Sequence, residues 1–176
     1  EGVKSVSEFL MEIDQVSSIK NVFYRGHANK NFKIIPGIYR SDEKGNSSYL
    51  ENEDLMYSEL VSMIPDEFEK KDTLQSLTLM QHYGLPTRIL DLTENALVGL
   101  YFACKDELIM SEDGLTVQAD GEVIVFDIKD EDICYYNSDK VSILANITKC
   151  KNDFSFNYFY FTYLNHIIND IDISLE

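Results

Sequence analysis

Arginine is scarce in this chain. The 176 residues include twelve lysines but only three arginines, Arg25, Arg40 and Arg88. Lysine therefore supplies most positive charge, and the planar, multi-donor guanidinium fork is confined to a few positions. Arg25 precedes a glycine and Arg88 lies in a polar segment. We expect both to occupy places that need this fork, against the alternative that chance put them there.

Basic residues as a whole are few, with 15 against 31 acidic residues and a net charge of −16. A protein this acidic is repelled by nucleic-acid phosphates and anionic lipids, so neither is an expected partner. The longest apolar run, Ala96 to Cys104, is far shorter than the ~20 residues of a membrane-spanning helix. No basic and then apolar leader opens the sequence, so no signal peptide is expected.

Several motifs are also missing. Cys104, Cys134 and Cys150 are widely spaced and match no zinc or CxxC pattern, which indicates reduced thiols of a cytoplasmic protein. The sequence has no P-loop, GxGxxG or GxSxG motif, which weakens ATPase, Rossmann oxidoreductase and α/β-hydrolase interpretations. It has no HExxH or EF-hand pattern either. We therefore predict no metal site and interpret segment 129–132, a lysine followed by three acidic residues, as a solvated loop.

The hydrophobic residues, 44% of the chain, suffice for one domain with a real core. Capping boxes start helices at Ser5 and Asp72, and Gly84 followed by Pro86 ends the second. The patterns predict helices over about 5–17, 50–64, 72–84 and 94–106, strands over 21–25 and 121–128, a further extended piece over 31–35, a loop over 41–48 and a turn at 113–114.

Three further expectations concern particular segments. The helix over 94–106 is expected to start at Asp91 or Thr93 and to bury a face made of Ala96, Leu97, Leu100, Tyr101 and Cys104. The apolar strand 121–128 is expected to be buried on both faces. Segment 153–168 is aromatic and fits a strand or a helix equally well. The order of elements predicts an α+β fold, a single domain with a small mixed or antiparallel sheet and flanking helices.

Residues 81–93 are the most distinctive stretch, with sequence Gln-His-Tyr-Gly-Leu-Pro-Thr-Arg-Ile-Leu-Asp-Leu-Thr. They gather an imidazole, a phenol, a guanidinium, a carboxylate and two hydroxyls between two apolar helical patterns. Such junctions are places where a rigid scaffold presents polar groups to a ligand. The segment therefore predicts a functional site.

Together with Tyr24-Arg25-Gly26, the block 81–88 and residues 90–93 resemble the FRG domain family, which is named for its Phe/Tyr-Arg-Gly motif. Residues 96–103, 121–128 and 142–146 also resemble the family pattern. The resemblance implies an FRG-type domain over residues 1–176 that continues past the end of this sequence. Leu92 stands where the family commonly has tryptophan, so the chain lacks an aromatic wall there.

The order of elements is also similar to that of ADP-ribosyltransferases, although such an analogy does not establish activity. In that fold a first-strand arginine holds the phosphate or ribose of NAD, a hydroxyl residue supports the site and a late glutamate orients the nucleophile. This resemblance maps Arg25 onto the arginine and Thr93 onto the hydroxyl residue. No residue convincingly matches the glutamate.

Each candidate residue also has a structural interpretation. Arg25, next to Gly26, is expected to grip an anion, or else to form a buried pair with Asp91. His82 fits a general acid or base, or a helix-end histidine that interacts with carbonyls, which we favour. Tyr83 fits a stacking or a core role.

The remaining candidates are close to these in sequence. His27 fits the same pocket as Arg25 or a solvated turn. Arg88 fits ligand binding or an ion pair with Asp91. Asp91 and Thr93 compete to cap the following helix, and the one that does not cap is freer to meet a ligand.

Two functions follow from these expectations. In the first, the predicted catalytic residues Arg25, His82, Asp91 and Thr93 and the predicted ligand-binding residues Arg25, Gly26, His27, Tyr83 and Arg88 form a site for a nucleotide-like molecule. NAD is the candidate substrate, in an ADP-ribosyltransferase-like module of a toxin or defence system. In the second, the chain is a non-enzymatic protein-interaction module in which residues 81–93, the polar block, are structural.

Overall fold

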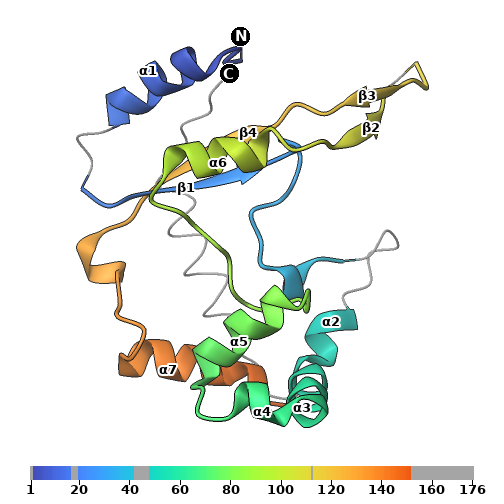
Figure 1. Cartoon of the computed structure of the whole chain (residues 1–176), viewed down its shortest axis with the longest axis vertical. Coiled ribbons are helices and arrows are strands. Elements are labelled where there is room, and N and C mark those ends of the chain that lie inside the picture. Colours follow the sequence, from blue (N-terminus) through green and yellow to red (C-terminus); the bar gives the residue numbers. More distant parts are fainter. Residues whose placement is uncertain (1, 17–19, 42–47, 112, 152–176) are drawn as a thin grey trace. The chain divides into compact units, whose positions relative to one another are not determined.

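The computed structural model describes residues 2–16, 20–41, 48–111 and 113–151. Over these residues it contains seven α-helices, three 3-10 helices and two small antiparallel sheets, which confirms the predicted α+β class (Figure 1). The described residues fall into two compact units, 2–33 with 91–133 and 34–90 with 134–151. Each unit is described by itself.

The first unit is built around a pair of antiparallel strands. In this pair Val22 lies opposite Asp127 and His27 lies opposite Glu122. The segment before the next helix continues the pairing, because Thr93 and Tyr24 exchange two backbone hydrogen bonds. The elements of this unit are α1 (Val6–Val16), β1 (Val22–His27), α6 (Ala96–Ala103), β2 (Leu108–Met110), β3 (Thr116–Gln118), β4 (Glu122–Asp127) and the 3-10 helix η2 (Asp130–Asp132).

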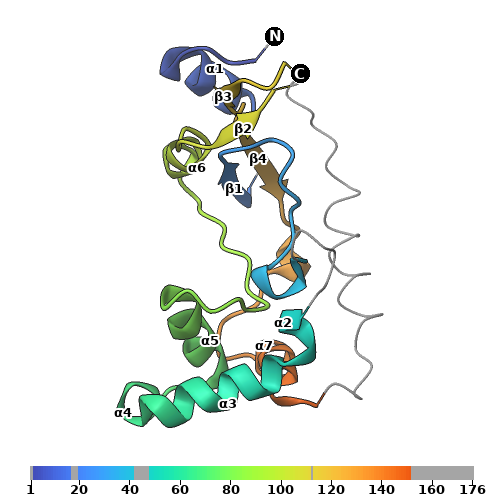
Figure 2. The ribbon, with the colours of Figure 1, turned by 90° about the vertical axis from the view of Figure 1, so that its right-hand side faces the viewer.

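Helix α6 packs closely on β1 and β4 because glycines face each other at the contact (Figure 2). A Cβ atom on Gly26 would lie 1.9 Å from the Gly99 carbonyl oxygen, and one on Gly99 would lie 3.2 Å from Cβ of Tyr24. Tyr24 and Gly26 therefore face the helix. Since strand side chains alternate, Arg25 and His27 lie on the opposite face of the sheet.

The expected buried face of α6 is wrong. Gly99 and Ala103 are buried, whereas Leu97, Tyr101 and Cys104 are exposed. Periodicity assigns the largest apolar side chains to the core. Here the smallest residues are inside, because only they allow two backbones to approach this closely.

The expected start of this helix is also wrong. It begins at Ala96, and its N-cap is Asn95, whose side chain accepts a hydrogen bond from the Leu97 N–H. Neither Asp91 nor Thr93 is the cap. The Thr93 hydroxyl oxygen accepts from the Asn95 N–H at 3.1 Å, so it supports the turn that precedes the helix. Asparagine caps a helix as well as aspartate does, and Asn95 is the residue directly before the first helical residue, Ala96.

Two expectations about strands need correction. Residues 31–35 are not a strand, because the buried Asn29 side chain accepts from the Asn31 N–H at 2.9 Å and turns the chain. The β4 strand is confirmed, but only Phe126 in it is fully buried. The hairpin of β2 and β3 was not predicted. It turns through Gly114, which has a φ of +76°.

The second unit is helical. It contains the 3-10 helix η1 (Gly37–Tyr39), α2 (Ser48–Glu51), α3 (Glu53–Met63), α4 (Pro65–Phe68), α5 (Thr73–His82), α7 (Asp139–Asn146) and the 3-10 helix η3 (Ile147–Lys149). Its core gathers Phe68, Leu77, Met80 and Ala145. The helix expected over 50–64 is divided at Asn52, the N-cap of α3.

The predicted signals around α5 are confirmed. The Asp72 carboxylate accepts from the Gln75 N–H, and the Gln75 side chain accepts from the Asp72 N–H, which completes the capping box. The helix ends at His82, and Gly84 follows with a φ of +87°. This left-handed conformation suits glycine and stops the helix before Pro86.

Within the described residues, every helix is too short or too polar to cross a bilayer. Cys104, Cys134 and Cys150 are free, as expected. Most of the predicted loop 41–48 and the aromatic segment 153–168 lie outside the described residues.

We predict that Gly26→Ala destabilises the protein by about 1 to 3 kcal/mol or more, because the added methyl group would overlap the backbone of α6. Urea unfolding followed by circular dichroism measures this free energy. Gly2→Ala is the control, since nothing lies within 4 Å of a Cβ there. Equal stability of the two variants would contradict the close packing of α6 on β1.

Candidate functional site

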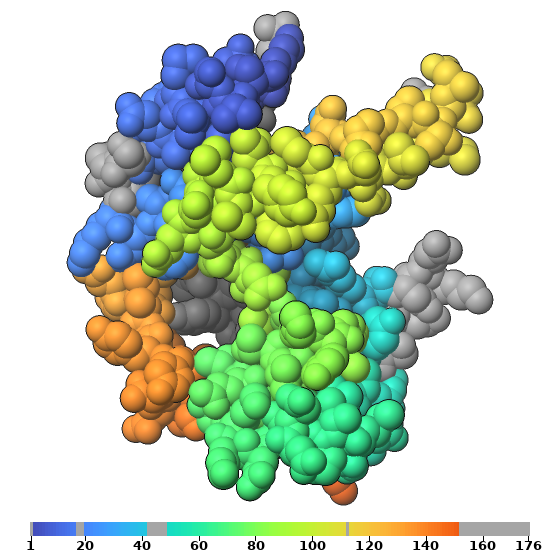
Figure 3. Space-filling model, in the orientation of Figure 1, coloured from blue at the N-terminus to red at the C-terminus, as the bar shows by residue number. Residues whose placement is uncertain are grey.

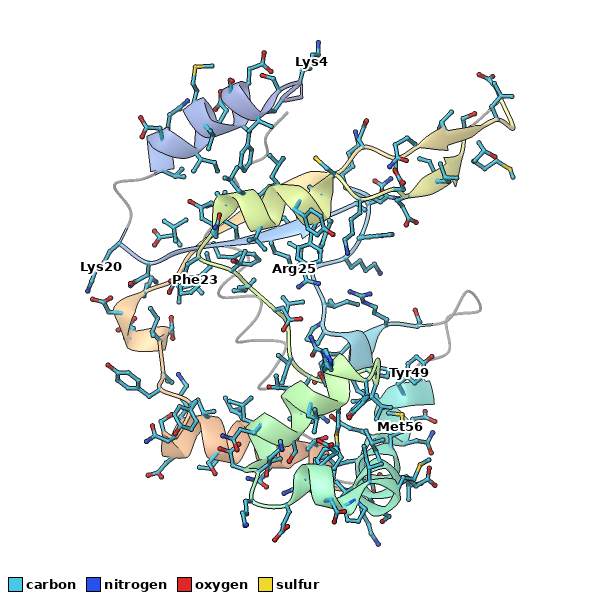
Figure 4. All side chains as sticks on the ribbon, viewed as in Figure 1. Lys4, Lys20, Phe23, Arg25, Tyr49 and Met56 are labelled. Atoms are coloured by element: carbon cyan, nitrogen blue, oxygen red, sulfur yellow. The ribbon has the colours of Figure 1, made fainter. Side chains whose placement is uncertain are left out.

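The first unit holds a hydrogen-bonded group on the sheet face opposite α6. Arg25 lies in β1 (labelled in Figure 4), and its Nε donates to Nε2 of His27 at 3.0 Å. Its Nη1 donates to the carbonyl oxygen of Asp91 at 2.7 Å. Nδ1 of His27 lies 3.1 Å from Oε1 of Glu122. We call Arg25, His27 and Glu122 the Arg–His–Glu cluster.

Strand geometry produces this cluster. Arg25 and His27 are two residues apart in β1 and so share a face of the sheet. Glu122 lies directly opposite His27 in the register of β1 and β4. Cross-strand neighbours on one face are within side-chain reach. The cluster therefore follows from the strand pairing, without any insertion or bulge.

Burial differs strongly across the cluster. His27 is 5% exposed, whereas Arg25 and Glu122 are half-buried. Burial raises the pKa of the Glu122 carboxyl. The ring of Phe32 meets the His27 ring edge-on, with 6.2 Å between the ring centres. The cluster thus has a buried imidazole at its centre and two charged groups that reach toward solvent.

Asp91 and Thr93, two predicted catalytic residues, lie in this same unit. Asp91 is exposed and contributes its backbone carbonyl to Arg25. Thr93 runs beside β1 through its backbone hydrogen bonds with Tyr24. Arg25, His27 and the Asp91 backbone are therefore close together, whereas the Thr93 side chain, opposite Tyr24, lies on the α6 face of the sheet. Their chemical roles stay predictions.

Arg88 lies in the second unit and is part of a buried ion pair. Its Nε donates to both carboxylate oxygens of Glu53, at 2.8 and 2.7 Å, and its Nη2 contacts Glu53 as well. Its Nη1 donates to the hydroxyl of Tyr39 at 2.8 Å. The side chains of Arg88 and Glu53 are only 14% and 6% exposed.

Glu53 thus replaces Asp91 as the ion-pair partner expected for Arg88. Asp91 is three residues from Arg88 in sequence but belongs to the other unit. Glu53 is in the first turn of α3, where an acidic residue is expected from the helix dipole alone. Nothing in its position indicated a partner 35 residues away.

His82 and Tyr83 are at the end of α5, as predicted, and both are exposed. Their rings meet edge-on with 6.1 Å between centres. The nearby Thr87 is buried, and its hydroxyl donates to Oε1 of Gln81 at 2.6 Å. Thr87 and Gln81 thus form a hydrogen bond within the polar block. The proposed roles of His82 and Tyr83 stay predictions.

A small pocket also lies within the second unit. It is lined by Glu53, Met56, Tyr57, Leu77, Met80, Leu85, Pro86, Thr87 and Thr148. Its lining is mostly apolar and includes none of the residues predicted for the site. We interpret it as a packing gap beside the buried ion pair.

In the segment 129–132, residues Asp130–Asp132 form η2, and Asp130 and Glu131 are exposed. Asp130 accepts hydrogen bonds from Lys20, at 2.5 Å, and from Asn21, at 2.6 Å (Figure 4 labels Lys20). These bonds lower the pKa of Asp130. Among the described residues, no three histidine, cysteine or acidic side chains are grouped as metal ligands.

Comparison with known families agrees with the resemblance. The FRG domain profile matches residues 20–111, which is more than half of the chain. The chain belongs to the FRG domain family. Neither the curated proteins nor the solved structures yielded a match to this chain.

The FRG match covers β1, the polar block and α6, and it ends before β4. Arg25, His27, Asp91, Thr93 and Arg88 are therefore within the matched region, while Glu122 is outside it. Sequence reasoning missed Glu122 because it is 97 residues from Arg25 and stands next to the apolar run of a strand, where it resembles the acidic residue at the strand's other end. Only the register of β1 with β4 reveals it.

We predict that Arg88→Met and Glu53→Gln each lower the free energy of unfolding by about 3 to 5 kcal/mol, because each leaves a buried charge without its partner. Chemical denaturation measures the change. Asp120→Asn is the control, since it removes an exposed pair with Lys30, worth about 0 to 1 kcal/mol. Arg88 variants as stable as this control would show that the buried pair does not hold the unit together.

Proposed function

We propose that this FRG-domain protein binds a nucleotide-like ligand, with NAD as the candidate, at the Arg–His–Glu cluster. The observation that carries the proposal is the placement of a fixed guanidinium and a partly buried carboxylate on one sheet face, on either side of a single imidazole. The proposal extends to a single FRG-type domain over residues 1–176 in the cytoplasm, and to a toxin or defence role.

The state of Arg25 supports anion binding. Hydrogen bonds at Nε and Nη1 fix the plane of its guanidinium. A side chain that is already oriented loses less conformational freedom when it binds, and the guanidinium fork matches phosphate geometry. Lysine is four times as frequent in this chain, yet it would supply neither the second anchor nor the fork.

Glu122 supports the more specific, ADP-ribosyltransferase-like form of the proposal. It is the acidic residue for which the sequence offered no candidate. In that reaction the bond between C1′ of the ribose and the nicotinamide nitrogen breaks, and nicotinamide leaves with the electron pair. An acceptor atom bonds to C1′, and a carboxylate takes the acceptor's proton. We assign this carboxylate to Glu122, whose raised pKa favours proton uptake.

Asp91 completes the proposal as the residue that orients a ribose, whereas Thr93 lies opposite Tyr24 and so presents its hydroxyl on the α6 side of the sheet, away from the cluster. Both lie on the segment that runs beside β1, within the same unit as the cluster. Gly26 contributes by allowing α6 to pack behind the strand, so its role is indirect. Arg88 is assigned to the scaffold instead, because Glu53 and Tyr39 already engage its guanidinium.

A second candidate function, a non-enzymatic interaction module, is favoured by the outer side of α6. Leu97, Tyr101 and Phe102 are between 44% and 64% exposed on this helix, which is part of the surface seen in Figure 3. Exposed apolar patches often mark protein contacts. Under this interpretation the Arg–His–Glu cluster only stabilises the sheet.

Calorimetric titration with NAD and ADP-ribose tests the first function. We predict that Arg25→Lys weakens binding about tenfold or more, because one anchored hydrogen bond and the fork are lost. Arg40→Lys is the matched control, since Arg40 is exposed and lies in the other unit. Absence of binding by the wild type, or equal affinity in both variants, would contradict the proposal.

Two further measurements separate the functions. Glu122→Gln is expected to keep ADP-ribose binding and to lose release of nicotinamide from NAD, followed by chromatography. The melting temperatures of Arg25→Lys and Asp91→Asn are expected to stay near that of the wild type, because functional polar groups add little to stability. A marked drop in both, with no ligand binding, would favour the interaction module.

A further inference from the structure

His27 is the least exposed member of the Arg–His–Glu cluster, and both of its ring nitrogens are engaged. Nε2 lies 3.0 Å from Nε of Arg25, and Nδ1 lies 3.1 Å from Oε1 of Glu122. Only 5% of the residue is exposed. Each ring nitrogen of such a buried imidazole either donates or accepts a hydrogen bond. The protonation state of the ring decides which nitrogen does which.

The two partners determine that protonation. A guanidinium nitrogen only donates hydrogen bonds, so Nε2 of His27 must carry the accepting lone pair. The ring proton is therefore on Nδ1 and is donated to the Glu122 carboxylate. An imidazolium would direct a second N–H at the Arg25 N–H, which is repulsive. The network thus assigns a neutral ring with the proton on Nδ1.

The surroundings hold this ring in place. Its backbone is paired with β4 opposite Glu122, and the Phe32 ring meets it edge-on at an interplanar angle of 65°. A flip of the ring would give up the hydrogen bonds to Arg25 and Glu122 together. His27 consequently orients both the Arg25 guanidinium and the Glu122 carboxylate through its two ring nitrogens.

We propose that His27 is a positioning residue, which sets the Arg25 guanidinium and the Glu122 carboxylate as one unit for a ligand that carries a pyrophosphate and a ribose. The inference rests on the proposed function and makes it more specific. His27 acts through its two neighbours and does not serve as the general base, because its accepting nitrogen is occupied by Arg25. From sequence it was expected to line the pocket or to lie in a solvated turn, and its burial within β1 excludes the turn.

The first test is spectroscopic and uses the protein without ligand. Long-range proton–nitrogen correlation spectra of ¹⁵N-labelled protein distinguish the histidine tautomers, and loss of a signal in His27→Gln identifies this ring among the three histidines. We expect a neutral ring protonated on Nδ1 near pH 7. In Arg25→Lys the signal should move toward a mixture of tautomers. A wild-type ring protonated on Nε2, or on both nitrogens, would overturn the assignment.

The second test compares two replacements of His27 by their affinity for ADP-ribose. His27→Gln keeps one acceptor and one donor, whereas His27→Phe keeps only a ring. We expect the phenylalanine variant to bind about tenfold or more weakly and the glutamine variant to retain most of the affinity. Melting temperatures of both variants identify losses that come from misfolding.

The outcomes separate the inference from the function beneath it. If His27→Phe is folded and binds ADP-ribose as tightly as the wild type, the positioning role is wrong and the proposed function stands. If the wild type shows the Nδ1-protonated ring but binds no ADP-ribose, the proposed function fails and the ligand-positioning role fails with it. Arg25→Lys should weaken ADP-ribose binding strongly in the wild type and much less in His27→Phe, because phenylalanine no longer orients the guanidinium.

Discussion

The close approach of α6 to β1 is the constraint on which the first unit depends. Gly26 and Gly99 leave no room for a side chain between the two backbones. Because strand side chains alternate, the contact at Gly26 fixes which face of the sheet each remaining side chain of β1 occupies. Tyr24 and Gly26 take the helix side, so Arg25 and His27 must take the opposite side. The motif thus needs a glycine because α6 packs against the strand there. Its arginine lies on the opposite face of the sheet because it is the neighbour of that glycine.

The second unit depends on a different interaction. The buried pair of Arg88 and Glu53 joins the end of the polar block to the first turn of α3, and Tyr39 adds a third hydrogen-bonding group. Desolvating two charges is costly, so such a pair is tolerated only where the geometry satisfies both. Two of the three arginines therefore meet the expectation of special positions in different ways. Arg25 is half-buried in a cluster that reaches solvent, whereas the Arg88 side chain is mostly buried in its ion pair with Glu53.

Local signals in the sequence predicted local structure well. The capping box of Asp72 with Gln75 and the glycine at position 84 marked both ends of α5, and a nearly continuous apolar run located β4. These features act within a few residues of themselves, so their effect is visible in sequence. The same reasoning chose the wrong cap for α6, because Asp91, Thr93 and Asn95 are chemically similar and only the path of the chain selects among them.

Long-range partners could not be predicted in this way. Glu53 and Glu122 resemble any other acidic residue until the strands and helices are assembled. The buried face of α6 was wrong for a related reason, since the choice of Gly99 over Leu97 depends on what the helix packs against. The candidate residues near β1 were found because a family motif contains them. The carboxylate that completes the cluster required the register of β1 with β4.

The most direct measurement of the central claim is a crystal structure of the protein with ADP-ribose. We predict that the pyrophosphate contacts the Arg25 guanidinium and that the ribose lies within hydrogen-bonding reach of Glu122, with His27 still between the two side chains. ADP-ribose bound elsewhere, with the Arg–His–Glu cluster untouched, would contradict it.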